Sequence, residues 1–511
     1  MVSKIYSAGT DGISGYLVEA EIDVSQGLPS FDIVGLPDAA VKESKERVRS
    51  AVKNCGYEVP ARRITVNLAP ADKRKEGAVF DLPILIGLLQ ASGQLLADLS
   101  HTAFIGELSL SGDIRPIYGV LPIVISLKEA GVKRVFVPHD NADEASIVQG
   151  IEVYPAEHVI RVVDHLLNVS PIPIALPRED LYFNNETYPL DFADVAGQFL
   201  PKKALETAAA GGHNILLIGP PGSGKSMLAK RLPSILPDMT HEESIEATKI
   251  HSISGLLSSS QPMVNKRPFR APHHTISYAG MAGGGSNPRP GEISLAHHGV
   301  LFLDELPEYP KNVLEVLRQP LEDGKVRIAR ASQTVEYPCN FMLVCAMNPC
   351  RCGFLGHPTK ACKCSPNDID RYVSKISGPL LDRIDIQIEV PAVSYGDLTN
   401  QNRGESSADI KERVNRARKI QQERYKGTGV TCNADIHGDL IKKYCTLAPS
   451  ASQLLQIIFE KLTLSARGYD RILKVSRTIA DLKEHDCIMD EDIAEASQYR
   501  ALDKKYFHSH R

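Results

Sequence analysis

One short stretch carries the residue types and spacing of a nucleotide-binding site. Residues 215–226 read ILLIGPPGSGKS, so four apolar residues precede the pattern G-x-x-x-x-G-K-S. The glycines let the backbone turn tightly and direct N–H groups at phosphate oxygens, and the following helix points its positive end there. We expect Lys225 to reach the β- and γ-phosphates of ATP and Ser226 to bind Mg²⁺. The predicted phosphate-binding set is Gly219, Pro220, Pro221, Gly222, Ser223, Gly224, Lys225 and Ser226.

A second apolar stretch, residues 299–305, reads GVLFLDE and ends in two adjacent acids. The run predicts a buried strand, and the two acids have separate expected roles. We expect Asp304 to hold Mg²⁺ together with the Ser226 hydroxyl, and Glu305 to polarise the attacking water. A phosphate loop followed downstream by this strand predicts a P-loop ATPase.

Four of the ten cysteines lie in one stretch punctuated by proline and glycine. They are Cys350, Cys352, Cys362 and Cys364. Four thiolates are a ligand set of structural zinc, although one residue between paired cysteines makes a tighter chelate than the usual two. The alternative is a reduced cysteine loop without metal, and His357 is a substitute ligand. Cys339 and Cys345 fall on strand positions and are expected in the core.

The composition around these motifs is that of a large globular chain. It has 511 residues, 43% of them hydrophobic, and this length suggests about three domains. The net charge of −4 means that any nucleic-acid binding must come from local basic patches. No leader pattern and no run of about 18 apolar residues is present, which predicts a cytoplasmic protein with no membrane partner and with reduced thiols.

The elements expected before the phosphate loop form a compact α/β domain over residues 1–170. The predicted strands are 16–24, 31–35, 64–68, 103–108 and 134–138, and the predicted helices are 39–54, 81–89 and 117–130. Prolines at 171, 173, 177 and 189 interrupt any periodic pattern, so residues 171–190 are expected to be a linker.

The order of the segments 66–68, 75–77, 104–112 and 131–138 resembles the proteolytic domain of Lon and the Lon-like domain of RadA. The Lon nucleophile and base positions hold Val79 and Leu121 here, and neither side chain supplies a nucleophile. The resemblance therefore implies a Lon-protease-like domain without its Ser–Lys dyad, used for assembly or DNA contact. Ten basic residues offer phosphate contacts or, alternatively, a solvated helix face; they are Lys42, Lys45, Arg47, Arg49, Lys53, Arg62, Arg63, Lys73, Arg74 and Lys75.

Several segments after the linker resemble AAA+ ATPases. Residues 194–198, DVAGQ, are similar to the segment that contacts adenine, which implies roles for Val195, Gly197 and Gln198. Asn348, at the end of the apolar stretch 341–347, stands where these proteins keep the sensor 1 residue that orients the lytic water.

A predicted hairpin over 326–335 and an insert with 269–275 and 283–285 resemble the MCM and Mg-chelatase clade, in whose rings such loops line the pore. Arg327 and Arg330 are the expected phosphate contacts on this hairpin. His273 and His274 lack a third ligand at fixed spacing, so loop packing or substrate contact is expected of them.

The segments 270–277, 303–308 and 377–385, together with the Lon-like front end, are similar to the ComM family, often labelled Mg-chelatase-like. The match covers essentially the whole chain. It implies that Arg383 is an arginine finger donated to the neighbouring subunit, with an ion pair to Asp382 or Asp385 as the alternative and Arg371 as a second candidate. Arg467 resembles the sensor 2 arginine, with Arg471 one turn further on as its alternative.

The predicted fold class is α/β, with four parts along the chain. They are the Lon-protease-like α/β domain (1–170), the linker (171–190), an AAA+ P-loop core of a parallel sheet with helices on both faces (191–395), and a C-terminal helical lid (396–511). The ComM resemblance implies a homo-oligomeric ring, a hexamer, that hydrolyses ATP and drives branch migration on single-stranded and branched DNA during natural transformation. The alternative is a Mg-chelatase-type motor that remodels a protein partner.

Overall fold

The computed structural model describes residues 2–178, 188–285, 288–329, 334–357, 359–393, 396, 404–462, 464–500, 502 and 506. The chain divides into two compact units. The first comprises Met1–Asn185 with His241–Asn265, and the second comprises Glu186–Thr240 with Lys266–Arg511. No helix in the described parts of the chain is both long enough and apolar enough to cross a membrane.

A seven-stranded mixed sheet forms the centre of the first unit, with the order β3-β4-β2-β1-β5-β8-β9. Its strands are β1 (Val2–Asp11), β2 (Ser14–Ser25), β3 (Ser30–Val34), β4 (Arg63–Ala69), β5 (Thr102–Phe104), β8 (Arg134–Pro138) and β9 (Glu152–Ala156). β1 and β2 pair antiparallel with Ile5 opposite Ala20, whereas β5, β8 and β9 are parallel. Alternate residues of β2 and β4 are buried, as the apolar alternation predicts.

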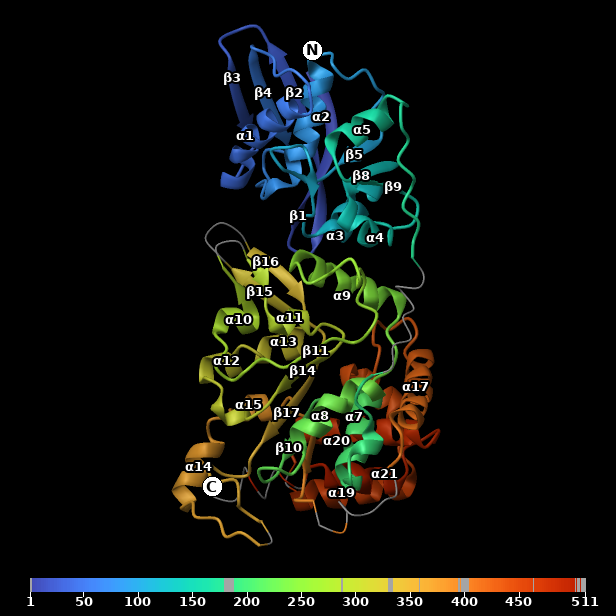
Figure 1. The fold of residues 1–511 in the computed structure, drawn as a ribbon. Coiled ribbons are helices and arrows are strands. Elements are labelled where there is room, and N and C mark those ends of the chain that lie inside the picture. The colour runs from blue at the N-terminus through green and yellow to red at the C-terminus, as the bar shows by residue number, and fades with distance from the viewer. Residues whose placement is uncertain are drawn as a thin grey trace. The chain divides into compact units, whose positions relative to one another are not determined.

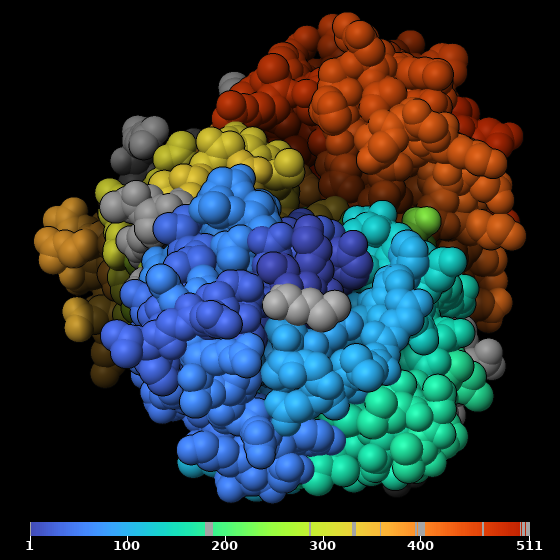
Figure 2. Space-filling view, turned by 90° about the horizontal axis from the view of Figure 1, so that it is seen from above, coloured from blue at the N-terminus to red at the C-terminus, as the bar shows by residue number. Residues whose placement is uncertain are grey.

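Helices and a short hairpin complete the first unit. They are α1 (Ala39–Asn54), α2 (Asp81–Ala91), α3 (Val120–Glu129), α4 (Ala142–Ala145), α5 (Val159–Leu166), α9 (His241–Ile253) and the pair β6 (Glu107–Leu108) and β7 (Ile114–Arg115). α2 is buried along almost its whole length, and α9 packs on α3 within this unit. The space-filling view looks onto this unit, which is coloured from blue to green (Figure 2).

Two of the basic residues suggested as phosphate contacts serve the interior of the first unit. Lys75 is fully buried, and its ammonium donates to the carbonyl oxygens of Pro70 and Lys73. The Arg47 Nε donates to the buried Asp81 carboxylate at 2.6 Å. Lys75 is therefore not available to bind phosphate, because a buried cation needs internal acceptors, whereas Arg47 is partly exposed and already paired.

A five-stranded parallel sheet organises the second unit, with the order β11-β14-β17-β10-β18; β11, β14, β17 and β10 are labelled in Figure 1. Its strands are β10 (Ile215–Ile218), β11 (Phe269–Arg270), β14 (Val300–Leu303), β17 (Met342–Met347) and β18 (Ile386–Glu389). β10, β14 and β17 are buried at every position, which explains their unbroken apolar runs. The carboxyl ends of β10, β14 and β17 therefore meet at one edge of the sheet.

The helices of this unit pack on the sheet or on one another. α7 (Phe199–Gly211) packs on β10 and β18, and α8 (Lys225–Arg231) packs on β17. The others near the sheet are α10 (Tyr278–Ala282), α11 (Glu292–Leu295), α12 (Lys311–Glu315), α13 (Arg318–Asp323), α14 (Pro366–Val373) and α15 (Gly378–Leu381). The C-terminal helices are α17 (Ser407–Arg424), α18 (Asp439–Tyr444), α19 (Pro449–Leu462), α20 (Ala466–Leu482) and α21 (Asp490–Gln498), and α17 and α20 pack on α7.

The predicted hairpin is present as β15 (Lys325–Ala329) and β16 (Thr334–Pro338), with Arg327 opposite Glu336. Arg330, expected at its tip, lies outside the described residues. Two shorter strands, β12 (Gly283–Gly284) and β13 (Arg289–Pro290), pair in the insert before β14. The α/β fold class with its parallel sheet and C-terminal helical region is confirmed.

Candidate nucleotide site

The phosphate loop joins the carboxyl end of β10 to the first turn of α8. Gly224 has a φ of 92°, a left-handed conformation that glycine adopts without strain, and α8 begins at Lys225. The Lys225 ammonium donates to the carbonyl oxygens of Gly219 and Pro220 at 2.8 and 2.9 Å. Burial lowers the Lys225 pKa to about 8, and the nearby carboxylates of Asp304 and Glu305 oppose that shift.

The two expected Mg²⁺ ligands are already side by side. The Ser226 hydroxyl donates to Oδ2 of Asp304 at 2.5 Å, and Oδ1 of the same carboxylate accepts the backbone N–H of Glu305 at 2.9 Å. A hydroxyl and a carboxylate are oxygen donors of the kind that Mg²⁺ prefers beside phosphate oxygens. The donor set of the chain therefore fits a Mg²⁺–nucleotide complex.

Glu305 follows Asp304 in a left-handed conformation, with a φ of 52°. Its side chain is 57% exposed, and its carboxylate lies 3.4 Å from Nδ1 of His274. The His274 ring lies beside the His273 ring, tilted at 34° with 4.0 Å between centroids, and meets Tyr309 edge-on. The sequence interpretation missed this pairing of His274 with Glu305. The available signal was its place just beyond β11, the strand that pairs with β14.

Asn348 follows the last residue of β17 and also reaches the phosphate loop. Its side-chain oxygen lies 3.3 Å from the Lys225 ammonium. The ends of β10, β14 and β17 thus bring together the residues expected to bind phosphate, bind Mg²⁺ and orient water.

The segment expected near adenine is tied to the phosphate loop by Gln198. Its side-chain amide donates to the carbonyl oxygens of Ser223 and Pro391, at 3.2 and 2.8 Å. Val195 is buried, and Gly197 has a φ of 61°, which suits glycine at this turn. The segment therefore lies against one wall of the nucleotide site.

The arginines expected to act on nucleotide form a separate cluster in the same unit. Arg383 pairs with Glu322 rather than with Asp382 or Asp385, and its side chain is 14% exposed. Burial lowers the pKa of Arg383, and the nearby cations of Arg467, Arg471 and Arg318 lower it further.

Asp382 is shared by the two lid arginines of this cluster. Arg467, 66% exposed, lies 3.8 Å from its carboxylate, and Arg471, 8% exposed, lies 3.4 Å from it.

The four cysteines of the predicted zinc site converge. Every pair of their Sγ atoms lies within 4.8 Å, and three pairs are separated by 3.4, 3.6 and 3.6 Å. Four thiolates around zinc at about 2.3 Å would be about 3.8 Å apart, so the spacing fits the ion. His357 instead accepts backbone N–H groups of Thr359 and Lys360 through Nδ1. Cys339 and Cys345 are buried, as predicted.

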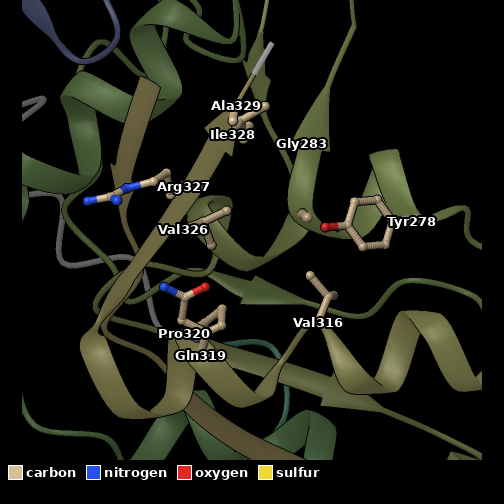
Figure 3. Close-up of a pocket in the computed structure, with 10 residues that line it drawn as sticks. Tyr278, Gly283, Val316, Gln319, Pro320, Val326, Arg327, Ile328 and Ala329 are labelled. Atoms are coloured by element: carbon tan, nitrogen blue, oxygen red, sulfur yellow. The ribbon is translucent and has the colours of Figure 1, made fainter. Parts of the chain in front are cut away.

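A small cavity lies at the foot of the hairpin. Its volume is about 150 Å³, and it is lined by residues of α10, α13 and β15 (Figure 3). Tyr278 turns its hydroxyl toward the cavity, whereas the guanidinium of Arg327 points to the other side. Arg327 Nε donates to Glu336 at 2.8 Å, across the hairpin. Arg327, which the sequence predicts to contact phosphate, is thus paired with the Glu336 carboxylate in this structure.

In the first unit, the two positions that hold the Lon dyad are apolar and buried. Val79 is 8% exposed and Leu121 is fully buried. The backbone N–H of Leu121 donates to the buried Glu144 carboxylate at 2.8 Å. Burial raises the pKa of Glu144, so the acid is stabilised in its neutral form.

Comparison with known families matches three consecutive parts of the chain. Residues 191–398 match the family described as magnesium chelatase, subunit ChlI. Residues 20–141 match subunit ChlI of Mg-chelatase, and residues 404–500 match the C-terminal part of the ChlI subunit.

Curated relatives cover nearly the whole chain. The competence protein ComM of Haemophilus influenzae is 45% identical over 98% of this chain and 97% of its own length. The protein YifB of Escherichia coli is 41% identical over 99% and 98%. A shorter match, 27% identical over 31% of each chain, is to Lon protease 2 of Bacillus subtilis.

Proposed function

The chain belongs to the ComM and YifB family of Mg-chelatase-like AAA+ ATPases, and we propose that it is a ring-forming ATPase that moves along DNA and drives branch migration. The ring is a hexamer that acts in the cytoplasm. The family implies ATP hydrolysis, and the observation that carries the site assignment is the meeting of phosphate loop, paired acids and Asn348 at one sheet edge.

Each residue at this edge has a distinct role in hydrolysis. Lys225 exchanges its carbonyl partners, Gly219 and Pro220, for β- and γ-phosphate oxygens when ATP binds. Ser226 and Asp304 hold Mg²⁺, which when bound neutralises charge that develops on the phosphates. Glu305 accepts a proton from the attacking water, and Asn348 orients that water.

Arg383 completes the site of a neighbouring subunit. The support is the family resemblance of this position and its place in a cluster of arginines, since phosphoryl transfer benefits from a guanidinium at the γ-phosphate. The ion pair with Glu322 neutralises the charge of Arg383 until the neighbouring subunit presents a bound nucleotide to it. Arg467 supplies the sensor 2 function, with Arg471, which lies near the same Asp382 carboxylate, as the alternative.

The DNA assignment rests on the similarity to ComM of Haemophilus influenzae, which is named a competence protein. We infer that the β15–β16 hairpin contacts DNA phosphates through Arg327 and Arg330, in a sequence-independent manner. Single-stranded and branched DNA are the proposed substrates, and natural transformation and recombination are the proposed process. The N-terminal Lon-like unit, without a Ser–Lys dyad, assembles the ring or contacts DNA.

ATP hydrolysis with and without single-stranded DNA tests this function. We expect stimulation by DNA of any sequence, binding that weakens steeply with salt, and ATP-dependent conversion of a three-stranded joint to products. Arg327→Ala weakens the stimulation, whereas Arg416→Ala, an exposed arginine of α17, serves as the charge-matched control. Active protein that neither binds DNA at low salt nor moves a branch point refutes the proposal.

A second candidate is a motor that remodels a protein partner. It is favoured by the three matches to the magnesium chelatase ChlI subunit, which extend over both units. ATP hydrolysis indifferent to DNA but stimulated by a protein favours this candidate.

We further propose that Cys350, Cys352, Cys362 and Cys364 hold one zinc ion. The convergence of their four thiols, with every Sγ–Sγ distance within 4.8 Å, supports this assignment. Metal analysis of protein purified without chelators tests it, with one zinc per chain as the expected result.

A further inference from the structure

The loop that carries the four cysteines begins at the nucleotide site itself. Asn348, which contacts Lys225, is followed by Cys350 after one residue. Cys350 is fully buried, and its carbonyl oxygen accepts the backbone N–H of Gly353 at 2.9 Å. Cys350 and Cys352 therefore lie within one tight turn that ends at Gly353.

This turn lies directly against the phosphate loop. A methyl group built on Gly353 would lie 2.6 Å from Cγ of Pro221 and closer still to its Cδ. Gly353 has a φ of 82°, so a side chain there would meet both backbone strain and a clash. Pro221 belongs to the phosphate loop, and the turn of Cys350–Gly353 thus forms part of its support.

The C-terminal end of the loop, which carries Cys362 and Cys364, returns to the turn that holds Cys350 and Cys352. α14 begins at Pro366, two residues after Cys364, and the Sγ atom of Cys364 lies within 4.8 Å of that of Cys350. No helix or strand is described between Met347 and Pro366. The order of this long connection depends on few backbone hydrogen bonds, so a crosslink between its two halves has a large effect on it.

We propose that metal bound by the four cysteines braces the phosphate loop, so that nucleotide binding depends on metal loading. The ion joins Cys350 and Cys352, in the turn that touches Pro221, to Cys362 and Cys364 beside α14. Without it the turn loses its anchor, and both Pro221 and Asn348 lose their support. This inference rests on the proposed zinc site and deepens it from a structural ion to a control of ATP binding.

Four variants of the full chain distinguish the effect of losing the metal from the effect of losing the contact between Gly353 and Pro221. The double variant Cys362→Ser, Cys364→Ser removes the two ligands that lie farther from Asn348 along the sequence. Gly353→Ala keeps all four thiols but forces the turn away from Pro221. Gly356→Ala is its matched control, because Gly356 has a similar φ of 77° but a methyl group there meets only Tyr506, at 4.0 Å. Cys487→Ser, a partly exposed cysteine outside the cluster, controls for thiol loss.

Zinc content and the affinity for a fluorescent ADP analogue in Mg²⁺ are measured on the same samples. We expect the double cysteine variant to lose its zinc and to bind ADP at least tenfold more weakly. Gly353→Ala retains zinc but also binds ADP weakly, whereas Gly356→Ala and Cys487→Ser match the unaltered protein in both measurements.

Three results refute the proposal that the metal stabilises the phosphate loop. They are unaltered protein without zinc, a zinc-free variant with full ADP affinity, and equal ADP affinity of the Gly353→Ala and Gly356→Ala variants. The second and third results leave the ATPase assignment intact. Failure of DNA to stimulate hydrolysis refutes the proposed DNA function and leaves the brace standing, because ADP binding involves no DNA.

Discussion

Glu305→Gln is the sharpest test of the catalytic assignment, because the structure separates this carboxylate from the groups that bind nucleotide. Lys225 is held by loop carbonyls, and Ser226 is bonded to Asp304; neither contact involves the Glu305 side chain. Gln has nearly the same shape as Glu and faces the same left-handed backbone, so the fold is expected to be unchanged. The variant therefore loses only the proton acceptor.

The expected loss of turnover is about 10²–10³-fold, or about 2.7–4.1 kcal/mol of transition-state stabilisation. A general base contributes about 10²–10⁴-fold in enzymes, and the lower part of that range fits a carboxylate that is 57% exposed. ATP affinity is expected to stay within about threefold, since the Ser226–Asp304 pair and the Lys225 contacts persist.

Phosphate release at saturating Mg²⁺–ATP and equilibrium binding of labelled ATP are the two assays. Glu308→Gln is the matched control, because Glu308 lies three residues further on and pairs with Lys375 outside the site. It is expected to hydrolyse ATP at the unaltered rate. Normal turnover by Glu305→Gln, or a loss of ATP binding as large as the loss of turnover, refutes the role assigned to Glu305.

Two further predictions concern residues that act on this centre. Arg383→Ala lowers the rate of ATP hydrolysis by about 10³-fold and leaves ATP affinity nearly intact. Mixing Arg383→Ala subunits with Lys225→Ala subunits restores some activity. If no mixing ratio restores activity, Arg383 does not act between subunits. His274→Ala lowers the turnover number by about tenfold without changing ATP affinity, because the imidazole orients the Glu305 carboxylate. His274→Asn keeps a hydrogen-bond donor and recovers part of the lost turnover. An unchanged turnover number in His274→Ala shows that the 3.4 Å contact has no catalytic role.

Local patterns in the sequence were sufficient for much of the fold. The helix expected at 39–54 is α1 with the same bounds, and the strand expected at 64–68 lies within β4. Apolar periodicity shows that one face of a helix or strand is buried, but it does not show which other element covers that face. It therefore predicts the element and leaves its packing partner undetermined. β1 was not predicted, because its central position buries small and polar residues such as Ser7 and Ala8 and leaves no clean alternation.

Long-range packing was beyond these patterns. The sequence places 241–265 inside the ATPase core, whereas in the structure these residues belong to the first compact unit, where α9 packs on α3. The ion pair between Arg383 and Glu322 and the approach of Gly353 to Pro221 join residues far apart in sequence. No local periodicity encodes such contacts, since each partner is compatible with many others until the chain is folded.

The difference between Asn348 and His274 shows which single piece of information was missing. Both follow a strand of the parallel sheet, yet only Asn348 was expected at the site, by resemblance to known ATPases. With the order β11-β14-β17-β10-β18 in hand, parallel pairing brings residues that follow adjacent strands to one edge. That rule places His274 beside Glu305 and Asn348 beside Lys225 without any resemblance. The motif supplies the chemistry of the site, and strand order determines which other side chains can take part in it.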